Sequence, residues 1–122
     1  MKTSPFLYAL MPSLLLLISC VNTHQNNCTE IFKTTYISIE NADLDDFYTL
    51  RTSTKDTFRC NYPEGNNYPV LNDQYQKKLV NNKDSFNFVG IINDSIVLVE
   101  PFVFSADDCH IHYISGNQNR SL

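Results

Sequence analysis

The sequence predicts an all-β, mainly antiparallel domain: a β-sandwich or open barrel of about seven strands with one short helix. Three observations lead to this fold class. Several short segments alternate β-branched or aromatic residues with polar ones, and turn-forming residues separate these segments. Only one stretch has apolar residues at helical spacing, and aromatic residues make up 12% of the chain, which is enough for a packed core. We expect this single domain to occupy residues 30–116.

The first part of the domain is expected to contain three strands. In the segment 31–40, Thr35, Ile37 and Ile39 alternate with polar neighbours. The acidic stretch 41–46 predicts a solvated turn, since its spacing does not match an EF-hand loop and the glycine of such a loop is missing. β-Branched and aromatic residues then dominate two segments that are expected to pair as a hairpin, residues 47–51 and 57–62.

A loop and the helix are expected next. Residues 63–69 begin and end with proline and contain one of the chain's three glycines, which predicts a loop. Leu71, Tyr75 and Leu79 recur at four-residue spacing, which predicts a helix of about ten residues. Its N-terminus has two candidate capping residues, Asn72 and Asp73.

The last third of the chain has the strongest strand pattern and predicts a three-stranded meander, formed by residues 86–92, 95–104 and 109–115. Asn93 and Asp94 are typical of a tight hairpin turn between the first two strands. Pro101 interrupts the second strand and indicates a sheet edge or a bulge. The polar residues 117–122 are expected to form a flexible tail.

The N-terminal segment has the features of an export signal. Lys2 precedes an apolar stretch that is too short to span a bilayer as a permanent helix. This stretch ends in Leu17-Ile18-Ser19-Cys20, which resembles the lipobox of bacterial lipoproteins. The resemblance implies that residues 1–19 are a signal peptide, that Cys20 is lipidated, and that residues 20–29 begin the mature chain as a polar tether.

The lipobox resemblance also implies a location. Two or three acyl chains would hold the protein at a membrane, since each buried methylene contributes roughly 0.8 kcal/mol. Cys20 is followed by Val21 rather than by an aspartate, which by the sorting pattern of enteric lipoproteins implies the outer membrane, facing the periplasm or exposed at the cell surface.

Charge excludes one class of partner. Without Lys2, the mature chain would carry eight basic and thirteen acidic residues. This acidic balance, with no basic cluster, argues against nucleic-acid binding. It also argues against electrostatic adhesion to an anionic membrane, so the acyl chains would be the only membrane anchor.

Lipidation of Cys20 would leave three cysteines, which are Cys28, Cys60 and Cys109. An exported protein is in an oxidising compartment, so one disulfide and one remaining thiol are expected. Cys109 is favoured as one partner because it lies in the most strand-like region, and Cys60 is preferred over Cys28 as the other. The sequence itself does not determine the pairing.

The step Asp108-Cys109-His110-Ile111 resembles a pattern in small bacterial lipoproteins with transthyretin-like, carboxypeptidase-regulatory-like domains. The family often has this step near the end of the domain and another cysteine upstream, such as Cys60 here. The resemblance covers the last third of the chain and implies a seven-stranded β-sandwich without catalytic machinery. The glycines and prolines that the family usually carries between its early strands are largely absent here.

His110 and His112 are the candidate metal ligands. Side chains alternate along a strand, so both histidines would point to one face and Cys109 to the other. Two imidazoles at this spacing suit zinc or copper, but a site needs a third ligand, for which Asp107, Asp108 and Glu100 are candidates. The alternative is that both histidines lie on a solvated face, while Cys109, Ile111 and Tyr113 fill the core.

No enzymatic activity is expected. The chain has no Gly-x-Ser-x-Gly elbow, glycine-rich phosphate loop or His-Glu-x-x-His motif. Cys109 and His110 would face opposite sides of a strand and could not share a proton. The sequence therefore predicts a non-enzymatic binding or structural module of the cell envelope, anchored through Cys20, with another envelope protein as its partner.

The sequence leaves three alternative functions open. They are a zinc- or copper-binding envelope protein that uses His110 and His112, an inhibitor or immunity protein for a toxin or hydrolase, and a eukaryotic secreted factor with two disulfides.

Overall fold

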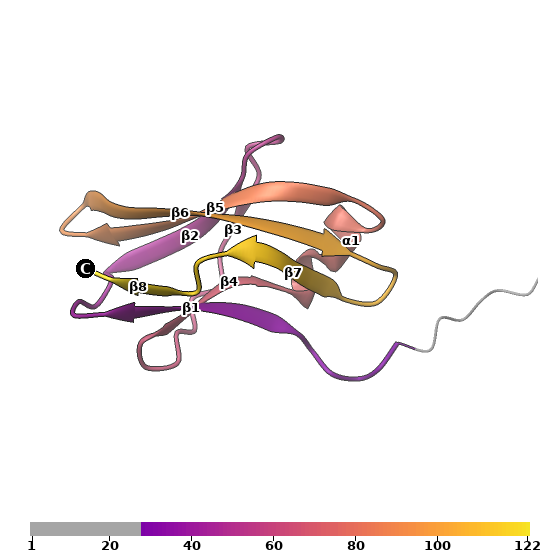
Figure 1. Cartoon of the computed structure of the whole chain (residues 1–122), viewed down its shortest axis with the longest axis horizontal. Helices are drawn as coiled ribbons and strands as arrows, with labels where there is room; N and C mark the ends of the chain where they lie inside the picture. The colour runs from indigo at the N-terminus through magenta and orange to yellow at the C-terminus, as the bar shows by residue number, and fades with distance from the viewer. Residues whose placement is uncertain (1–27) are drawn as a thin grey trace, which may run out of the picture.

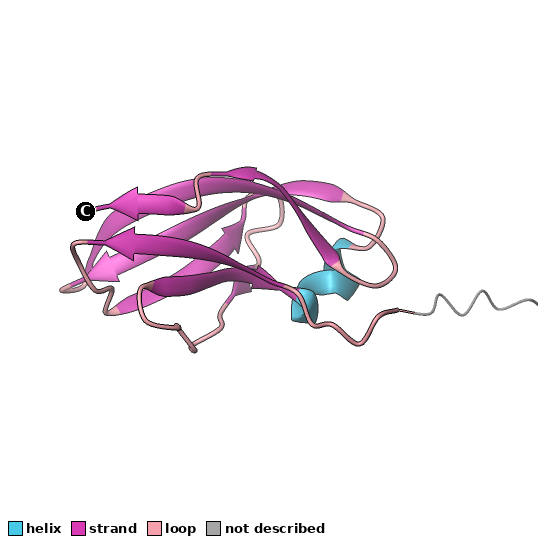
Figure 2. Cartoon of the chain, turned by 60° about the horizontal axis from the view of Figure 1, so that its bottom comes forward, coloured by secondary structure: helices cyan, strands magenta, loops and turns pink. Residues whose placement is uncertain are grey.

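The computed structural model describes residues 28–122, which form two β-sheets packed face to face (Figure 1). The eight strands are β1 (Thr34–Glu40), β2 (Asp46–Arg51), β3 (Thr57–Phe58), β4 (Asn67–Asn72), β5 (Lys83–Ile92), β6 (Ser95–Ala106), β7 (Ile111–Gly116) and β8 (Asn119–Ser121). A 3₁₀ turn, η1 (Asp73–Tyr75), continues into the short helix α1 (Gln76–Leu79), which lies at one end of the sandwich (Figure 2). The predicted all-β sandwich is confirmed, and the sheets do not close into a barrel.

The smaller sheet has the strand order β4-β1-β8, and the larger one has the order β3-β2-β5-β6-β7. Every pair of neighbouring strands is antiparallel except β1 and β8, which are parallel. The chain passes from the larger sheet to the smaller one at Gly116, whose φ of 135° is in the region that favours glycine. A Cβ atom at this position would also clash with the ring of Phe102.

Phenylalanine rings fill the space between the sheets. Phe86 and Phe88 on β5 are fully buried, as are Phe102 and Phe104 on β6. The centroids of Phe86 and Phe104 lie 5.6 Å apart with the rings nearly perpendicular, an arrangement that aromatic pairs prefer. Along β6 the buried residues alternate with exposed ones, of which Val99 is 51% exposed. The core therefore follows the two-residue period of the strands.

The β5–β6 hairpin matches its prediction. Asn93 and Asp94 have φ values of 50° and 61°, as the favoured two-residue hairpin turn requires. Pro101 pairs with Asn87 of β5, whereas β7 begins to pair with β6 only at Phe102. β6 thus has a free edge beside Pro101, where the missing N–H of proline costs no ladder hydrogen bond.

Other elements differ from the prediction. The expected loop 63–69 ends early, because β4 starts at Asn67 and pairs with β1. Pro69 is tolerated there since β4 is an edge strand. The helix is shorter than expected because Leu71 belongs to β4, while the predicted cap is confirmed: Asn72 Oδ1 accepts a hydrogen bond from the Gln74 N–H at 2.9 Å.

The ends of the domain also differ. β3 comprises only two residues of the strand expected at 57–62. Part of the expected flexible tail, Asn119–Ser121, forms β8, because its backbone pairs with β1 despite its polar side chains. The predicted signal peptide 1–19, Cys20 and residues 21–27 of the tether lie outside the described residues. Within residues 28–122, no helix is long and apolar enough to cross a membrane.

Candidate binding groove between strands β1 and β7

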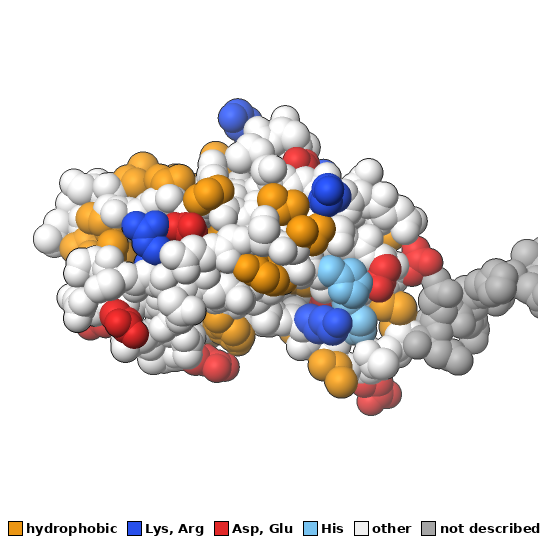
Figure 3. All heavy atoms as spheres, viewed as in Figure 1, with side chains coloured by type: hydrophobic (Ala, Val, Ile, Leu, Met, Phe, Trp, Pro, Cys, Tyr) orange, Lys and Arg blue, Asp and Glu red, His pale blue; other side chains and the backbone are white. Residues whose placement is uncertain are grey.

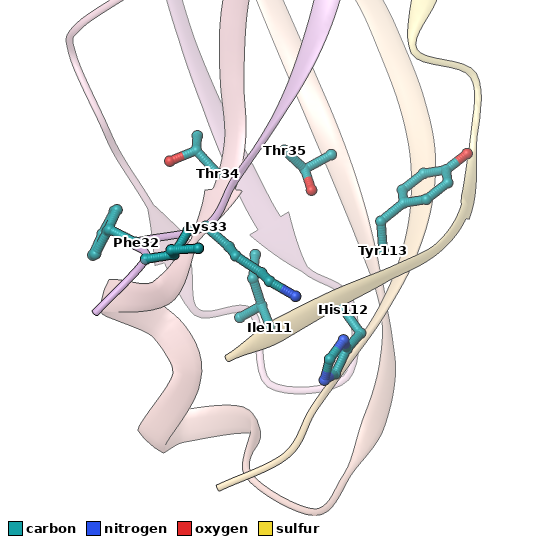
Figure 4. Close-up of a pocket in the computed structure, with 8 residues that line it drawn as sticks. Phe32, Lys33, Thr34, Thr35, Ile111, His112 and Tyr113 are labelled. Carbon is teal, nitrogen blue, oxygen red and sulfur yellow. The ribbon is translucent and has the colours of Figure 1, made fainter. Parts of the chain in front are cut away.

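A groove separates the first half of β1 from β7. β7 is the edge strand of the larger sheet, and β1 has β8 beside it only from Ser38 onward. The groove has a volume of about 390 Å³ and is lined by Ile31, Phe32, Lys33, Thr35, His112 and Tyr113, among others. Figure 4 shows the side chain of Lys33 extending from the start of β1 toward β7. Two strand edges that belong to different sheets therefore face the same opening.

The carboxylate of Asp73 ties the starts of both strands together. Asp73 Oδ2 accepts a hydrogen bond from the Lys33 N–H at 2.8 Å and lies 2.7 Å from His110 Nδ1. Asp73 Oδ1 accepts a hydrogen bond from the Ile111 N–H at 2.9 Å. Burial acts to raise the pKa of Asp73, but these three interactions together lower it below its ordinary value. Asp73 therefore acts as a charged clamp at this end of the groove.

Asp107 shapes the turn that leads into β7. Its Oδ1 accepts hydrogen bonds from the backbone N–H groups of Cys109 and His110, both at 2.8 Å. Its Oδ2 lies 2.7 Å from His112 Nε2. The pKa of Asp107 is lowered, first by the backbone N–H of His110 and then by the side chain of His112. This turn thus depends on an ionised carboxylate.

A disulfide joins Cys28 to Cys109 beside this turn. The expectation that Cys109 is one partner is confirmed, whereas the preference for Cys60 as the other is wrong. Cys60 is a free cysteine, partly buried and packed against the core. Cys28 reaches Cys109 because the chain before β1 runs past the same turn, where Thr29 Oγ1 lies 2.8 Å from His110 Nε2.

The two histidines bind different carboxylates. His110 lies before β7 rather than on it, and its side chain, 12% exposed, contacts Asp73 and Thr29 through its two ring nitrogens. His112 is on β7, 41% exposed, and contacts Asp107. Glu100, a candidate third ligand, instead pairs with Arg120. No group of three or more His, Cys, Asp or Glu side chains within residues 28–122 is suited to a metal ion, and metal binding stays a prediction.

Two residues at the groove have roles that the sequence prediction does not include. Asp73 is predicted only as an alternative helix cap, yet it is the clamp, and the cap is Asn72. Lys33 carries no sequence signal, because its role depends on a strand that lies far from it in the chain. Figure 3 shows histidine, basic and hydrophobic side chains gathered on this face, near the end where the described chain begins.

The chain was compared with family models, curated proteins and solved structures, and these comparisons assign it to no family. The resemblance to lipoproteins rests on Leu17-Ile18-Ser19-Cys20, and that to transthyretin-like domains on Asp108-Cys109-His110-Ile111. Both resemblances stay predictions. None of the three comparisons finds a match for the chain.

Proposed function

We propose that this chain is a lipid-anchored protein of the bacterial envelope, that its domain is a non-enzymatic binding module, and that the groove between β1 and β7 is its binding surface. Cys20 would carry the lipid and hold the protein at the outer membrane. The observation that carries the proposal is the groove itself, which lies between two strand edges that no other strand of residues 28–122 covers. Exposed strand edges commonly bind other chains.

The polar residues around the groove support a binding role because they fix its shape. Asp73 and Asp107 each accept two backbone N–H hydrogen bonds, and each also contacts a histidine. The disulfide adds a covalent link at the same end. A binding surface on strands held in this way keeps its geometry before the partner arrives, which lowers the entropic cost of binding.

Photo-crosslinking in cells tests the binding surface. The photoreactive residue benzoylphenylalanine replaces Tyr113, which lines the groove, or Ile96, which is 61% exposed near the Asn93–Asp94 turn and serves as the control. We expect a discrete crosslinked product from the Tyr113 position and none from Ile96. No product from Tyr113, or the same product from both positions, would contradict the proposed surface.

Intact mass of the protein from native membranes tests the anchor. A chain that begins at Cys20 and carries acyl groups is expected, and Cys20→Ser should release the protein from the membrane fraction. A mass without lipid would contradict the anchor and leave the crosslinking result to decide on the groove.

A further inference from the structure

We infer that the groove takes an extended peptide segment of the partner, which pairs with β7 as an additional strand and carries a carboxylate that pairs with Lys33. This inference rests on the proposed function and specifies the chemistry of the partner. Three features of the described residues support it: β7 is an uncovered sheet edge without proline, its backbone N–H and C=O groups point into the groove, and Lys33 gives the groove an unpaired positive charge.

β7 is the sheet edge best suited to accept another strand. The opposite edge of the larger sheet is β3, which has two residues, and the smaller sheet ends in β8, with three residues, and in β4, which contains Pro69. The part of β6 before Phe102 also has a free edge, and Pro101 interrupts it. Short strands and proline are the ordinary means by which proteins prevent strand addition. β7 has six residues without proline, and its only ionisable side chains are those of His112 and Tyr113.

The backbone of β7 directs hydrogen-bonding groups into the groove. The Ile111 N–H points away from β6, since it donates to Asp73 Oδ1. The ladder with β6 is regular from Ala106–Ile111 to Phe104–Tyr113, and its register shifts only after that. Because backbone groups alternate along a strand, the N–H and C=O of Tyr113 face the same side as the Ile111 N–H. An incoming strand would therefore find a donor and an acceptor at Tyr113.

The charge and polarity of the groove specify the incoming chain. Lys33 is exposed and makes no ion pair within residues 28–122, although the whole chain carries a net charge of −4. The nearby carboxylates of Asp73 and Asp107 are already engaged by backbone N–H groups and histidines. A carboxylate on the partner would complement Lys33. The exposed aromatic rings of Phe32 and Tyr113 offer contacts for apolar side chains beside it.

A random heptapeptide library displayed on phage tests the inference with the full-length chain in detergent. The selection uses the unaltered protein and Lys33→Glu, with Lys77→Glu as the matched control: Lys77 is an exposed lysine on α1, away from the groove lining. We expect enriched peptides that contain Asp or Glu among β-branched residues. Binding should be about tenfold weaker or more in Lys33→Glu and unchanged in Lys77→Glu. Amide hydrogen exchange at Tyr113 should slow on peptide binding.

Three results would overturn the inference. The first is the absence of enriched peptides. The second is enrichment of peptides that bind Lys33→Glu equally well or leave exchange at Tyr113 unchanged. The third is protection of the Tyr113 amide without peptide, in step with protein concentration, which would identify a second copy of this chain as the occupant. In each case the crosslink from position 113 still decides separately whether the groove is a binding surface.

Discussion

The β5–β6 hairpin is stabilised by buried phenylalanine rings, whereas the junction of β1 and β7 is stabilised by carboxylates and a disulfide. The hairpin strands are adjacent in the chain, and Phe86 lies directly opposite Phe102. At the junction, the Asp73 carboxylate binds the N–H of Lys33, which lies 40 positions earlier in the chain, and the N–H of Ile111, which lies 38 positions later. The two disulfide-bonded cysteines are 81 positions apart. The hairpin should therefore form from local sequence, while the junction requires the completed fold and responds to pH and redox conditions.

Removal of the disulfide should have the largest effect. In the double variant Cys28→Ser, Cys109→Ser, the free energy of unfolding should fall by about 4.5 kcal/mol. The reason is that the bridge joins cysteines 81 positions apart, and without this loop the unfolded chain gains conformational entropy. Urea denaturation measures this loss. Cys60→Ser, which removes the free thiol, is the control and should cost much less. An equal loss in both variants would contradict a special role for the bridge.

Truncation within the hairpin should come next. Phe86→Ala should lower the free energy of unfolding by about 4 kcal/mol, since Phe86 is fully buried against Tyr75 and Phe104. Val99→Ala on the exposed face should cost less than about 1 kcal/mol. Unlike the disulfide variant, Phe86→Ala should lose the same stability with or without reductant. A reductant-dependent loss specific to Phe86→Ala would show that the two regions are not independent.

Neutralising the clamp should have a smaller effect. Asp73→Asn should cost about 2 kcal/mol, because charge-assisted hydrogen bonds to Lys33 N–H, Ile111 N–H and His110 are weakened. Asp43→Asn changes an exposed carboxylate and should stay within about 0.5 kcal/mol of the unaltered protein. Hydrogen exchange should speed up at Ile111 more than at Phe86. A larger increase in hydrogen exchange at Phe86 than at Ile111 would show that Asp73 stabilises the hairpin more than the junction.

Acid should produce the smallest difference between variants. The folded-state pKa of Asp73 and of Asp107 lies below the ordinary aspartate value of about 3.9. Their contribution to stability is therefore present above that value and is lost as pH falls from it through the lower folded-state pKa values. Stability curves measured from pH 6 to pH 2 should fall less steeply for Asp73→Asn than for the unaltered protein. Parallel curves would mean that Asp73 contributes nothing to acid sensitivity.

The elements that could be predicted from sequence are those whose cause lies nearby in the chain. Asn93 and Asp94 between two alternating segments determine a hairpin, and the cap at Asn72 depends on the amide two residues ahead. The extent of β4 could not be predicted, because Leu71 fits the helical spacing equally well and only its pairing with Thr35 of β1 places it in a strand. β8 is polar, and only its pairing with β1 makes it a strand.

Residues around the groove could not be predicted for the same reason: their contacts are with residues far away in the chain. His110 and His112 are two residues apart, which suggests one shared site, but the turn at Asp107 places His110 before the strand, beside Asp73. The pairing of Cys109 with Cys28 depends on the path of the chain before β1, which has no periodic pattern. Lys33 gains its place in the groove only when β1 and β7 are brought together.

The disulfide also sets the largest distance that can separate the proposed anchor from the domain. If Cys20 carries lipid as proposed, the first fixed point of the domain is Cys28, and the chain between them spans at most about 28 Å when fully extended. Without the bridge, the first residue whose backbone is fixed to the domain by a hydrogen bond is Lys33, and the largest distance from Cys20 grows to about 45 Å. Because Cys109 lies just before β7, oxidation would keep this end of the groove nearer to the bilayer than reduction would. A groove held near the bilayer would meet membrane-bound partners at a high effective concentration. Reduction would lengthen the connection to the anchor and lower that effective concentration.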